Sequence, residues 1–479
     1  MASPQASTAQ PSTVHPYRPD PAILSLGDGV FDAVEPAAFP ETILRFANRR
    51  WASRVGLELD EAGWVRHFGR FEPLADNLPQ PLALRYHGHQ FRVYNPDIGD
   101  GRGFLFAQLR EAPDTLHGRA GRLLDLGTKG SGQTPYSRFG DGRLTLKGGL
   151  REVLATEMLE ALGVNTSKSF ALVETGEELT RNDEPSPTRS AVLTRLSHGH
   201  VRIGSFQRLA FEENAAGIAA LVRYSLERLF DEAPGEDDGA NAVRLFEYSA
   251  AATAGLAANY LAAGFVHGVL NSDNINITGE SFDYGPWRFA PTWDEEFVAA
   301  YFDQSGLYAF GRQPEAIHWD LAQLGGCLAL IADGPALSAI VDGWSAQFER
   351  ALVAALVRRL AVQPDETADR GLVSALLTAL RTQLVTIDRL FFDWRGGRVP
   401  DDAVYRDEAY TGLRERLAAR DPLPHALDHE YWRDDGPCSM HIDEVEAIWA
   451  AIADGDDWGP FEAKIAAIRR TGAAHQIEP

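Results

Sequence analysis

Cysteine is almost missing from this 479-residue chain, which has only Cys327 and Cys438. This scarcity excludes a fold held together by a disulfide framework. Apolar runs of roughly 18 residues, the length of a membrane-spanning helix, are also missing, so we expect no membrane partner. Residues 1–21 are rich in Ser, Thr and Pro, and they have neither the apolar core of a secretory signal nor the arginines of a transit peptide. We therefore expect a disordered tail, 1–21, on a cytoplasmic protein.

Positive charge is also scarce, with 45 Lys and Arg against 68 Asp and Glu and a formal net charge of −23. Such an acidic chain is a poor candidate for nucleic-acid binding, which depends on Lys and Arg neutralising phosphates. Residues 126–151 are the exception, because five basic side chains there accompany a single acidic one, Asp141. This segment is either a small anion site or a solvated basic face, and charge alone leaves both open.

The order of expected elements indicates an α+β protein with two lobes. The chain is long enough for more than one hydrophobic core, because single cores stop growing near roughly 250–300 residues. The expected strands are residues 104–111, 123–130, 169–175 and 190–196. The expected helices are residues 40–56, 146–163, 215–230, 244–264, 442–453 and 461–470, with further helices up to about residue 398.

This order matches a protein-kinase-like bilobal plan with extensions at both ends. The expected division has four parts: the tail; residues 22–205 as an N-terminal extension and nucleotide-binding lobe; residues 206–398 as a helical lobe with the catalytic loop; and residues 399–479 as a helical extension. A fold analogy of this kind does not by itself give a function.

The segment "HGVLNSDNINITGESFDYG", residues 267–285, resembles a kinase catalytic loop followed by the Asp-Phe-Gly motif. In an ungapped alignment His267 falls on the motif's His, Asn274 on its metal-binding Asn, and Asp283 on the Asp of Asp-Phe-Gly. The catalytic Asp, however, falls on Val269, which cannot accept a proton. The segment is therefore an inactive kinase loop, a loop with a displaced base, or a loop that serves another reaction.

Asp273 is the candidate for a displaced general base, since it lies beside Asn274 and a carboxylate can take the proton of an incoming hydroxyl. Asn274 and Asp283 offer oxygen ligands of the kind that Mg²⁺ uses together with substrate phosphates. The residues between them have a length that suits a short hairpin returning both ligands to one place. An Asx-rich turn without function is the alternative interpretation.

Glycine-rich turns and scattered cations are the remaining candidates for phosphate binding. Gly99, Gly101 and Gly103 alternate just before an expected strand, and Arg102 adds a charge there. Glycine lets backbone N–H groups approach phosphate oxygens, although such turns are also common without any ligand.

Lys129 ends an expected strand, and a kinase pairs such a Lys with a helix Glu, here Glu152 or Glu157. Arg195 and Arg202 follow near strand ends and could clamp a polyphosphate bidentately. Taken one at a time, these charged residues are more often surface residues or salt-bridge partners.

Taken together, these strings resemble the selenoprotein O (SelO, or YdiU) family of protein adenylyltransferases. The strings that carry the resemblance are "GHQF", "KGSGQTPYSRFGDGR", "LREVLATE", "VRIGSF", "GFVHGVLNSDNINITG" and "GLYAFGRQP", all within residues 80–330. The resemblance implies a pseudokinase fold that transfers AMP from ATP to Ser, Thr or Tyr hydroxyls of proteins. It also implies that ATP binds flipped relative to kinases, so that the α-phosphate faces the acceptor.

The same resemblance implies a role for each matching residue. Asp273 matches the proton acceptor, and Asn274 and Asp283 match the ligands of Mg²⁺, with Mn²⁺ as a possible substitute. The residues that match nucleotide-binding positions are Gly99, Gly101, Arg102, Lys129, Glu152, Asp141, Gly142, Arg195, Arg202 and, through the metal, Asp283.

Some positions depart from the family pattern. Arg92 replaces the usual Gly after "GHQF", and residues before 80 match poorly. The last cysteine, Cys438, is far from the C-terminus, so redox control through a C-terminal cysteine is in doubt, as is the choice of protein substrate. A kinase that transfers the γ-phosphate and a non-catalytic ATP-binding protein stay open as alternatives, although a mere binder would not need a base.

Overall fold

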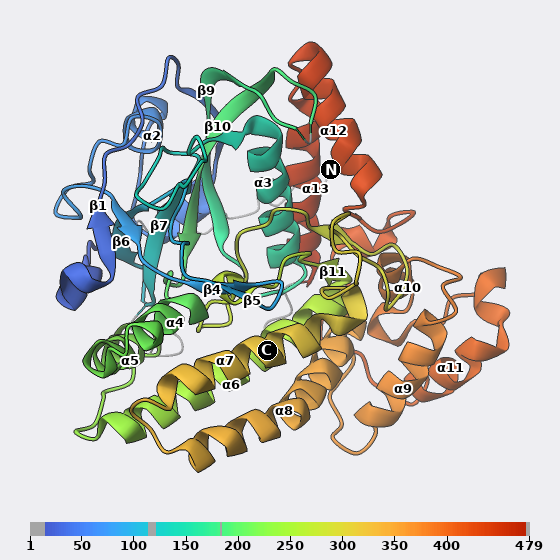
Figure 1. Ribbon diagram of the computed structural model, residues 1–479. Helices are drawn as coiled ribbons and strands as arrows, with labels where there is room; N and C mark the ends of the chain where they lie inside the picture. Colours follow the sequence, from blue (N-terminus) through green and yellow to red (C-terminus); the bar gives the residue numbers. More distant parts are fainter. Residues whose placement is uncertain (1–14, 114–120, 183, 476–479) are drawn as a thin grey trace.

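The computed structural model describes residues 15–113, 121–182 and 184–475. Figure 1 shows a strand-rich N-terminal part packed against a C-terminal part built almost wholly from helices. The expected α+β class is therefore confirmed. In the described part of the chain, no helix is both long enough and apolar enough to cross a membrane.

An eight-stranded sheet organises the N-terminal part, with strand order β1-β3-β6-β7-β10-β9-β2 and β8 paired to β10. Its pairings are antiparallel throughout, as between Gln108 of β6 and Asp125 of β7. The strands are β1 (Phe31–Ala33), β2 (Ile43–Ala47), β3 (Leu82–Leu84), β6 (Leu105–Arg110), β7 (Leu123–Lys129), β8 (Leu144–Thr145), β9 (Lys168–Leu179) and β10 (Thr188–Ser197). Two small ribbons complete the set: β4 (Gly88–Gln90) with β5 (Val93–Asn95), and β11 (Phe265–Val266) with β12 (Arg288–Phe289). All four strands expected from the sequence are present.

Helix α3 (Leu146–Ala161) lies against β9 and β10, as its apolar spacing predicted. The Thr145 hydroxyl caps its start by accepting the backbone N–H of Gly148 at 3.1 Å. Leu150, Val153 and Leu154 are fully buried, so the sheet fixes which face of α3 points inward.

The C-terminal part is centred on the long helix α6 (Asp238–Ala263), which packs against α5, α7 and α8. It ends at Gly264, whose φ of +70° is the left-handed cap that favours glycine. The other helices are α1 (Arg49–Arg54), α2 (Glu61–Phe68), α4 (Ile203–Phe211), α5 (Ala215–Leu229), α7 (Gln313–Leu328), α8 (Gly334–Leu360), α9 (Asp369–Leu380), α10 (Ile387–Asp393), α11 (Thr411–Leu417), α12 (Ile442–Gly455) and α13 (Gly459–His475). Short 3₁₀ turns are η1 (Ala22–Gly29), η2 (Ser272–Asn274), η3 (Phe310–Arg312), η4 (Arg395–Gly397), η5 (Ala403–Arg406), η6 (Glu408–Tyr410) and η7 (Glu430–Arg433).

The last two helices return to the N-terminal part, where Figure 1 shows α13 beside α3. Arg469 of α13 reaches Glu157 of α3 through two hydrogen bonds of 2.8 and 2.9 Å. Both late helices expected from the sequence are therefore present, and one of them supports the helix that also carries Glu152.

Three local expectations differ from the structure. The helix expected at 40–56 is strand β2 followed by the short α1, because residues 43–47 pair with β9 and Asn48 then caps α1. The disordered tail was expected to reach residue 21, yet residues 15–21 are described, and Asp20 donates its backbone N–H to Gln108 at 3.0 Å. Residues 1–14 lie outside the described part. The hairpin expected between Asn274 and Asp283 is discussed with the site.

Candidate active site

A cavity of about 630 Å³ lies where the glycine turn, the end of β7 and the catalytic-loop segment meet. This volume is in the ordinary range for small-molecule sites. The predicted residues that line it are Gly99, Gly101, Arg102, Lys129, Asp141, Gly142, Arg195, Arg202, Asp273 and Asp283. Glu152 and Asn274 are not among the lining residues; Glu152 lies behind Lys129.

The glycine turn is held against the following loop by close packing. A Cβ on Gly99 would lie only 2.5 Å from the ring of Tyr136, so a side chain cannot replace this glycine without displacing that ring. The Ser137 hydroxyl donates to the carbonyl of Gly101 at 2.5 Å. The glycines thus bring two turns together at the cavity wall, and Arg102 extends from the first turn toward solvent.

Four charged side chains form one ionic cluster at the inner end of the cavity. Lys129 donates to Glu152, which α3 supplies, and its Nζ also lies 2.6 Å from Oδ1 of Asp283. Nη1 of Arg195 lies 3.2 Å from the same Asp283 oxygen and 3.8 Å from Oε2 of Glu152. Of the two glutamates that the sequence offered, Glu152 is the one that contacts Lys129. Glu157 instead faces α13.

Asp283 is held in its ionised form by these neighbours. Burial alone would raise the pKa of this carboxyl, but the positive charges of Lys129, Arg195 and Arg102 outweigh it and keep the pKa well below the usual range. The residue has a φ of +62°, an uncommon backbone conformation for a non-glycine residue. Beside it, the His267 ring contacts the carbonyl of Phe282 through Nε2 at 2.8 Å. An ionised carboxylate in this position is chemically suited to bind a metal cation.

Asp273 has the opposite electrostatic environment. Burial raises its pKa to about 6, with Arg202 only partly offsetting the effect. Its Oδ1 is buried and has no hydrogen-bond partner among the described residues. The backbone of Gly88 packs closely against this oxygen, because a Cβ added to Gly88 would lie only 2.7 Å from it. Asp273 lines the cavity, and a desolvated carboxylate there is chemically suited to accept a proton.

Arg202 is fixed by contacts that the sequence did not reveal. Its Nη2 lies 3.1 Å from Oδ1 of Asp100, its guanidinium stacks 4.2 Å from the ring centre of Tyr86, and its Nη1 donates to the Asp273 carbonyl at 3.3 Å. Asp100 in turn accepts the backbone N–H of Leu84 at 3.1 Å. This network sets the position of both Arg202 and the loop that carries Asp273.

Asp100 also reveals a signal that sequence reasoning missed. The tetrapeptide Gly-Asp-Gly-Arg occurs twice, at residues 99–102 and 140–143, and both copies line the cavity. In the second copy Gly142 has a φ of +70°, and a Cβ there would lie 2.3 Å from Gly132. A repeated short motif around one cavity would have placed Asp100 among the candidates.

Asp141 lies at the rim of the cavity and is exposed. It forms a two-pronged ion pair with Arg181 at 2.8 and 3.1 Å, and Arg181 is a second lining residue that the sequence analysis missed. The basic segment at 126–151 is divided by the fold. Lys129, Arg138 and Arg143 line the cavity, whereas Lys147 and Arg151 pair with Glu446 of α12. Part of the segment is thus a cationic part of the cavity wall, and part is an inter-helix contact.

Asn274 ends the turn η2 and donates its side-chain amide to the carbonyl of Val269 at 3.0 Å. The expected hairpin between it and Asp283 is wrong. Asn276 instead bridges to Arg202 and Ser281 bridges to Thr166, because the segment finds backbone partners on other elements. Asn274 and Asp283 are therefore positioned by contacts to the rest of the fold.

The types of donor at Asp283 and Asn274 suit a magnesium ion that is shared with a nucleotide. No group of three or more His, Cys, Asp or Glu suited to a metal occurs in the described ranges. Mg²⁺, however, is commonly held by one or two protein groups together with substrate phosphates and water. The ionised carboxylate of Asp283 and the side-chain oxygen of Asn274, whose amide nitrogen is already used on Val269, are suitable groups.

The family model described as "Protein adenylyltransferase SelO" matches residues 15–408. The chain belongs to the SelO family. The match begins at residue 15, so the family resemblance extends over residues before 80, where we expected a poor match. Similar proteins named "Protein nucleotidyltransferase YdiU" come from Gloeobacter violaceus (42% identity over 94% of this chain and 95% of the relative) and Synechocystis (40% identity over 92% and 96%). A relative with the same name from Rhodopseudomonas palustris is 34% identical over 94% of this chain and 92% of its own length.

Proposed function

We propose that this SelO-family chain transfers AMP from ATP to Ser, Thr or Tyr hydroxyls of protein substrates and releases pyrophosphate in a Mg²⁺-dependent reaction. The observation that carries the proposal is the pair of carboxylates with opposite electrostatics in one cavity. Asp283 is stabilised as an anion by Lys129 and Arg195, whereas Asp273 is desolvated and its Oδ1 has no hydrogen-bond partner in the described part of the chain. Such a difference is the usual mark of a metal ligand beside an acid or base.

In the proposed reaction, the acceptor hydroxyl oxygen forms a bond to the α-phosphorus of ATP, and the bond from that phosphorus to the bridging oxygen of the β-phosphate breaks. Pyrophosphate leaves with the bonding electrons. Asp273 takes the proton of the acceptor hydroxyl, a role that Val269, at the kinase position, cannot fill. The fold analogy supports the same scheme: the sheet with α3 acts as the nucleotide lobe of a kinase-like fold and the helical part as its catalytic lobe, with the domain division given above.

The cationic side chains that line the cavity would bind the triphosphate. Lys129, Arg195 and Arg202 contribute charge from the inner end, and Arg102 contributes from the glycine turn. Guanidinium groups suit this task because their forked donors match phosphate oxygens. Asn274 and Asp283 would hold Mg²⁺, or Mn²⁺ in its place, and the metal would offset triphosphate charge and polarise the phosphoryl oxygens.

A kinase is the second candidate, because His267, Asn274 and Asp283 align with a kinase catalytic loop. The two reactions use the same groups and differ in which phosphorus faces the acceptor. They also differ in the product released, which is pyrophosphate for AMP transfer and ADP for phosphoryl transfer. Incubating the chain with ATP and Mg²⁺, with its own hydroxyls as acceptors, and quantifying both products tests the proposal. Pyrophosphate formed in step with protein modification is expected, whereas ADP formed in step with it would assign the chain as a kinase.

A further inference from the structure

A second cavity, of about 370 Å³, lies behind α3, where the end of α8, the turn η4 and α13 meet. It shares no lining residue with the candidate active site. Five arginines line it, Arg50, Arg358, Arg359, Arg395 and Arg469, against two glutamates. In a chain with a net charge of −23, this concentration of arginine needs a physical explanation.

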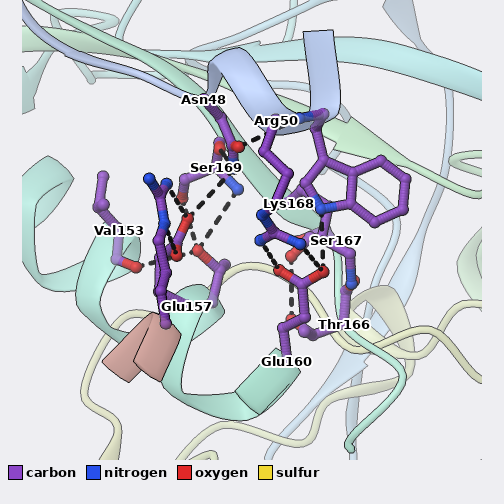
Figure 2. A network of polar contacts seen from close by, with 12 residues as sticks. Asn48, Arg50, Val153, Glu157, Glu160, Thr166, Ser167, Lys168 and Ser169 are labelled. Atoms are coloured by element: carbon purple, nitrogen blue, oxygen red, sulfur yellow. Dashed lines mark hydrogen bonds and ion pairs between the residues drawn. The ribbon is translucent and has the colours of Figure 1, made fainter. Parts of the chain in front are cut away.

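Three of the five arginines already have carboxylate partners. Arg50 forms two hydrogen bonds with Glu160, at 2.9 and 2.6 Å, and Figure 2 shows this pair together with the polar contacts around Glu157. Arg469 forms its two hydrogen bonds with Glu157. Arg359 pairs with Asp388 at 3.0 Å, and Asp388 is not one of the residues that line the cavity. Their positive charges are thus compensated within the protein.

Arg395 is not compensated in this way. Only 1% of its surface is exposed, and its hydrogen bonds go to three backbone carbonyls, those of Ala426, Arg359 and Ala474, at 3.0, 3.4 and 3.5 Å. Its guanidinium also stacks 4.1 Å from the ring centre of Trp432. Within the described part of the chain it has no carboxylate partner, and a buried charge without one is costly.

Arg358 adds a second uncompensated cation at the mouth of the cavity. It donates to the neutral side-chain oxygen of Asn259 at 2.6 Å and has no ion pair in the described ranges. The nearby Arg359 has a buried Nε without a hydrogen-bond partner there. Burial and the charges of Arg395 and Arg359 lower the pKa of His475 to about 3, so this ring adds no positive charge. Among the described residues, the cavity is left with two guanidinium groups, those of Arg358 and Arg395, that no carboxylate neutralises.

We infer that this cavity is a binding site for a small molecule that carries a dianionic phosphate group. Two uncompensated guanidinium groups match a dianion, and their forked donors match phosphate oxygens. The cavity is larger than a single phosphate ion needs, which leaves room for an organic part of the ligand. Because the walls come from α3, α8 and α13, a bound anion would join the helix that carries Glu152 to the C-terminal helices.

The test uses the full chain, inorganic phosphate as the probe, and a matched pair of charge reversals on helix α8. Arg358→Glu removes the exposed cation at the mouth of the cavity. Arg350→Glu makes the same charge change two turns away on α8, at an exposed residue that does not line the cavity. Phosphate binding is measured by calorimetry and by thermal shift without nucleotide, so that no other phosphate compound competes for the cavity, and the comparison of the two variants separates this cavity from the candidate active site.

The expected result is phosphate binding and a rise in Tm for the unmodified chain and for Arg350→Glu, with affinity reduced about tenfold or more in Arg358→Glu. Equal phosphate affinity in the two variants would overturn the inference, as would the absence of any phosphate effect on the unmodified chain. Both variants change exposed residues, and each is first checked for an unchanged Tm without phosphate. The readout is binding, so it does not depend on which reaction the chain catalyses.

Discussion

Lys129 and Asp283 meet at 2.6 Å between Nζ and Oδ1, although 153 residues of sequence separate them. The pair joins the end of β7 to the Asp-Tyr-Gly segment of the helical part, and Glu152 on α3 holds Lys129 from the other side. A cation that is held by two carboxylates is a strong choice for positioning phosphates. The contact therefore links the sheet, α3 and the catalytic loop in one electrostatic unit.

Removing Lys129 tests this unit. Lys129→Ala is expected to reduce AMP transfer sharply and to weaken ATP binding, because the cavity loses a cation proposed to bind phosphate and Asp283 and Glu152 keep only Arg195 as a cationic partner. Glu152→Gln should also reduce transfer, by freeing Lys129. Glu157→Gln is the matched control on the same helix, since its carboxylate faces α13. Transfer rates and Tm are measured for all three variants. Equal losses of transfer in the two Glu variants, at similar Tm, would remove Glu152 from the site.

Asp283→Ala is expected to abolish transfer and to weaken metal-dependent nucleotide binding. In the proposed reaction, the ionised carboxylate of Asp283 is the charged group that holds Mg²⁺. Calorimetry with ATP in the presence and absence of Mg²⁺ separates the two effects: the metal should strengthen binding to the unmodified chain and have little effect on the variant. A folded variant with normal transfer would show that Asp283 has no role in the reaction.

Replacing Asp273 is expected to change the rate of transfer much more than the affinity for ATP. If it accepts the hydroxyl proton, Asp273→Ala should lower the transfer rate by about 10²–10⁴-fold while ATP affinity changes little. Val269→Asp, added to this variant, should not restore transfer, because the kinase position would face the wrong phosphate. ATP affinity and rate are measured for the single and double variants. A rescue by Val269→Asp with transfer of the γ-phosphate would contradict the displaced-base account.

The buried Asp273 should also cost stability at high pH. Its pKa of about 6 lies above the usual 3.8 for Asp, so the folded state binds the proton more tightly than the unfolded chain. The stability that this proton contributes is present below about pH 4 and is lost as the pH rises through about 6. The facing charges are Arg202 and Arg138, which favour the carboxylate, and Asp283 and Asp320, which oppose it.

The variant Asp273→Asn measures this cost. In metal-free, nucleotide-free buffer it should be more stable than the unmodified chain at pH 8, by on the order of 1–3 kcal/mol, and the gain should shrink toward pH 4. Denaturant unfolding at several pH values provides the measurement. A variant that is less stable than the unmodified chain at pH 8 would mean that the carboxylate is well compensated in the fold.

Local patterns were enough to predict β7 and α3, two of the elements that position the site. The end of β7 and the apolar spacing of α3 could be predicted from neighbouring residues, and the distance in sequence then suggested Glu152 as a partner of Lys129. The hairpin after Asn274 could not be predicted, because its backbone groups pair with distant segments. The helix prediction for residues 43–47 is wrong for the same reason, because their pairing with β9 overrides the local preference for helix.

The missed site residues depend on tertiary structure in the same way. Asp100 joins the site through Arg202, and Arg181 through Asp141, and neither pair is close in sequence. The arginine-lined second cavity also cannot be predicted from the sequence, because its walls come from five separated segments. Charge counts along the chain do not include such contacts, so they indicated one basic segment, whereas the fold gathers basic side chains around two cavities.

The central claim, AMP transfer by a kinase-like site with a displaced base, is tested most directly by the position of the transferred label. The purified chain is incubated with Mg²⁺ and ATP labelled at the α-phosphate, or in parallel at the γ-phosphate, and covalent label on the protein is counted after denaturation. The account predicts label from the α position alone, lost in Asp273→Ala and Asp283→Ala. Label from the γ position without label from the α position would contradict it.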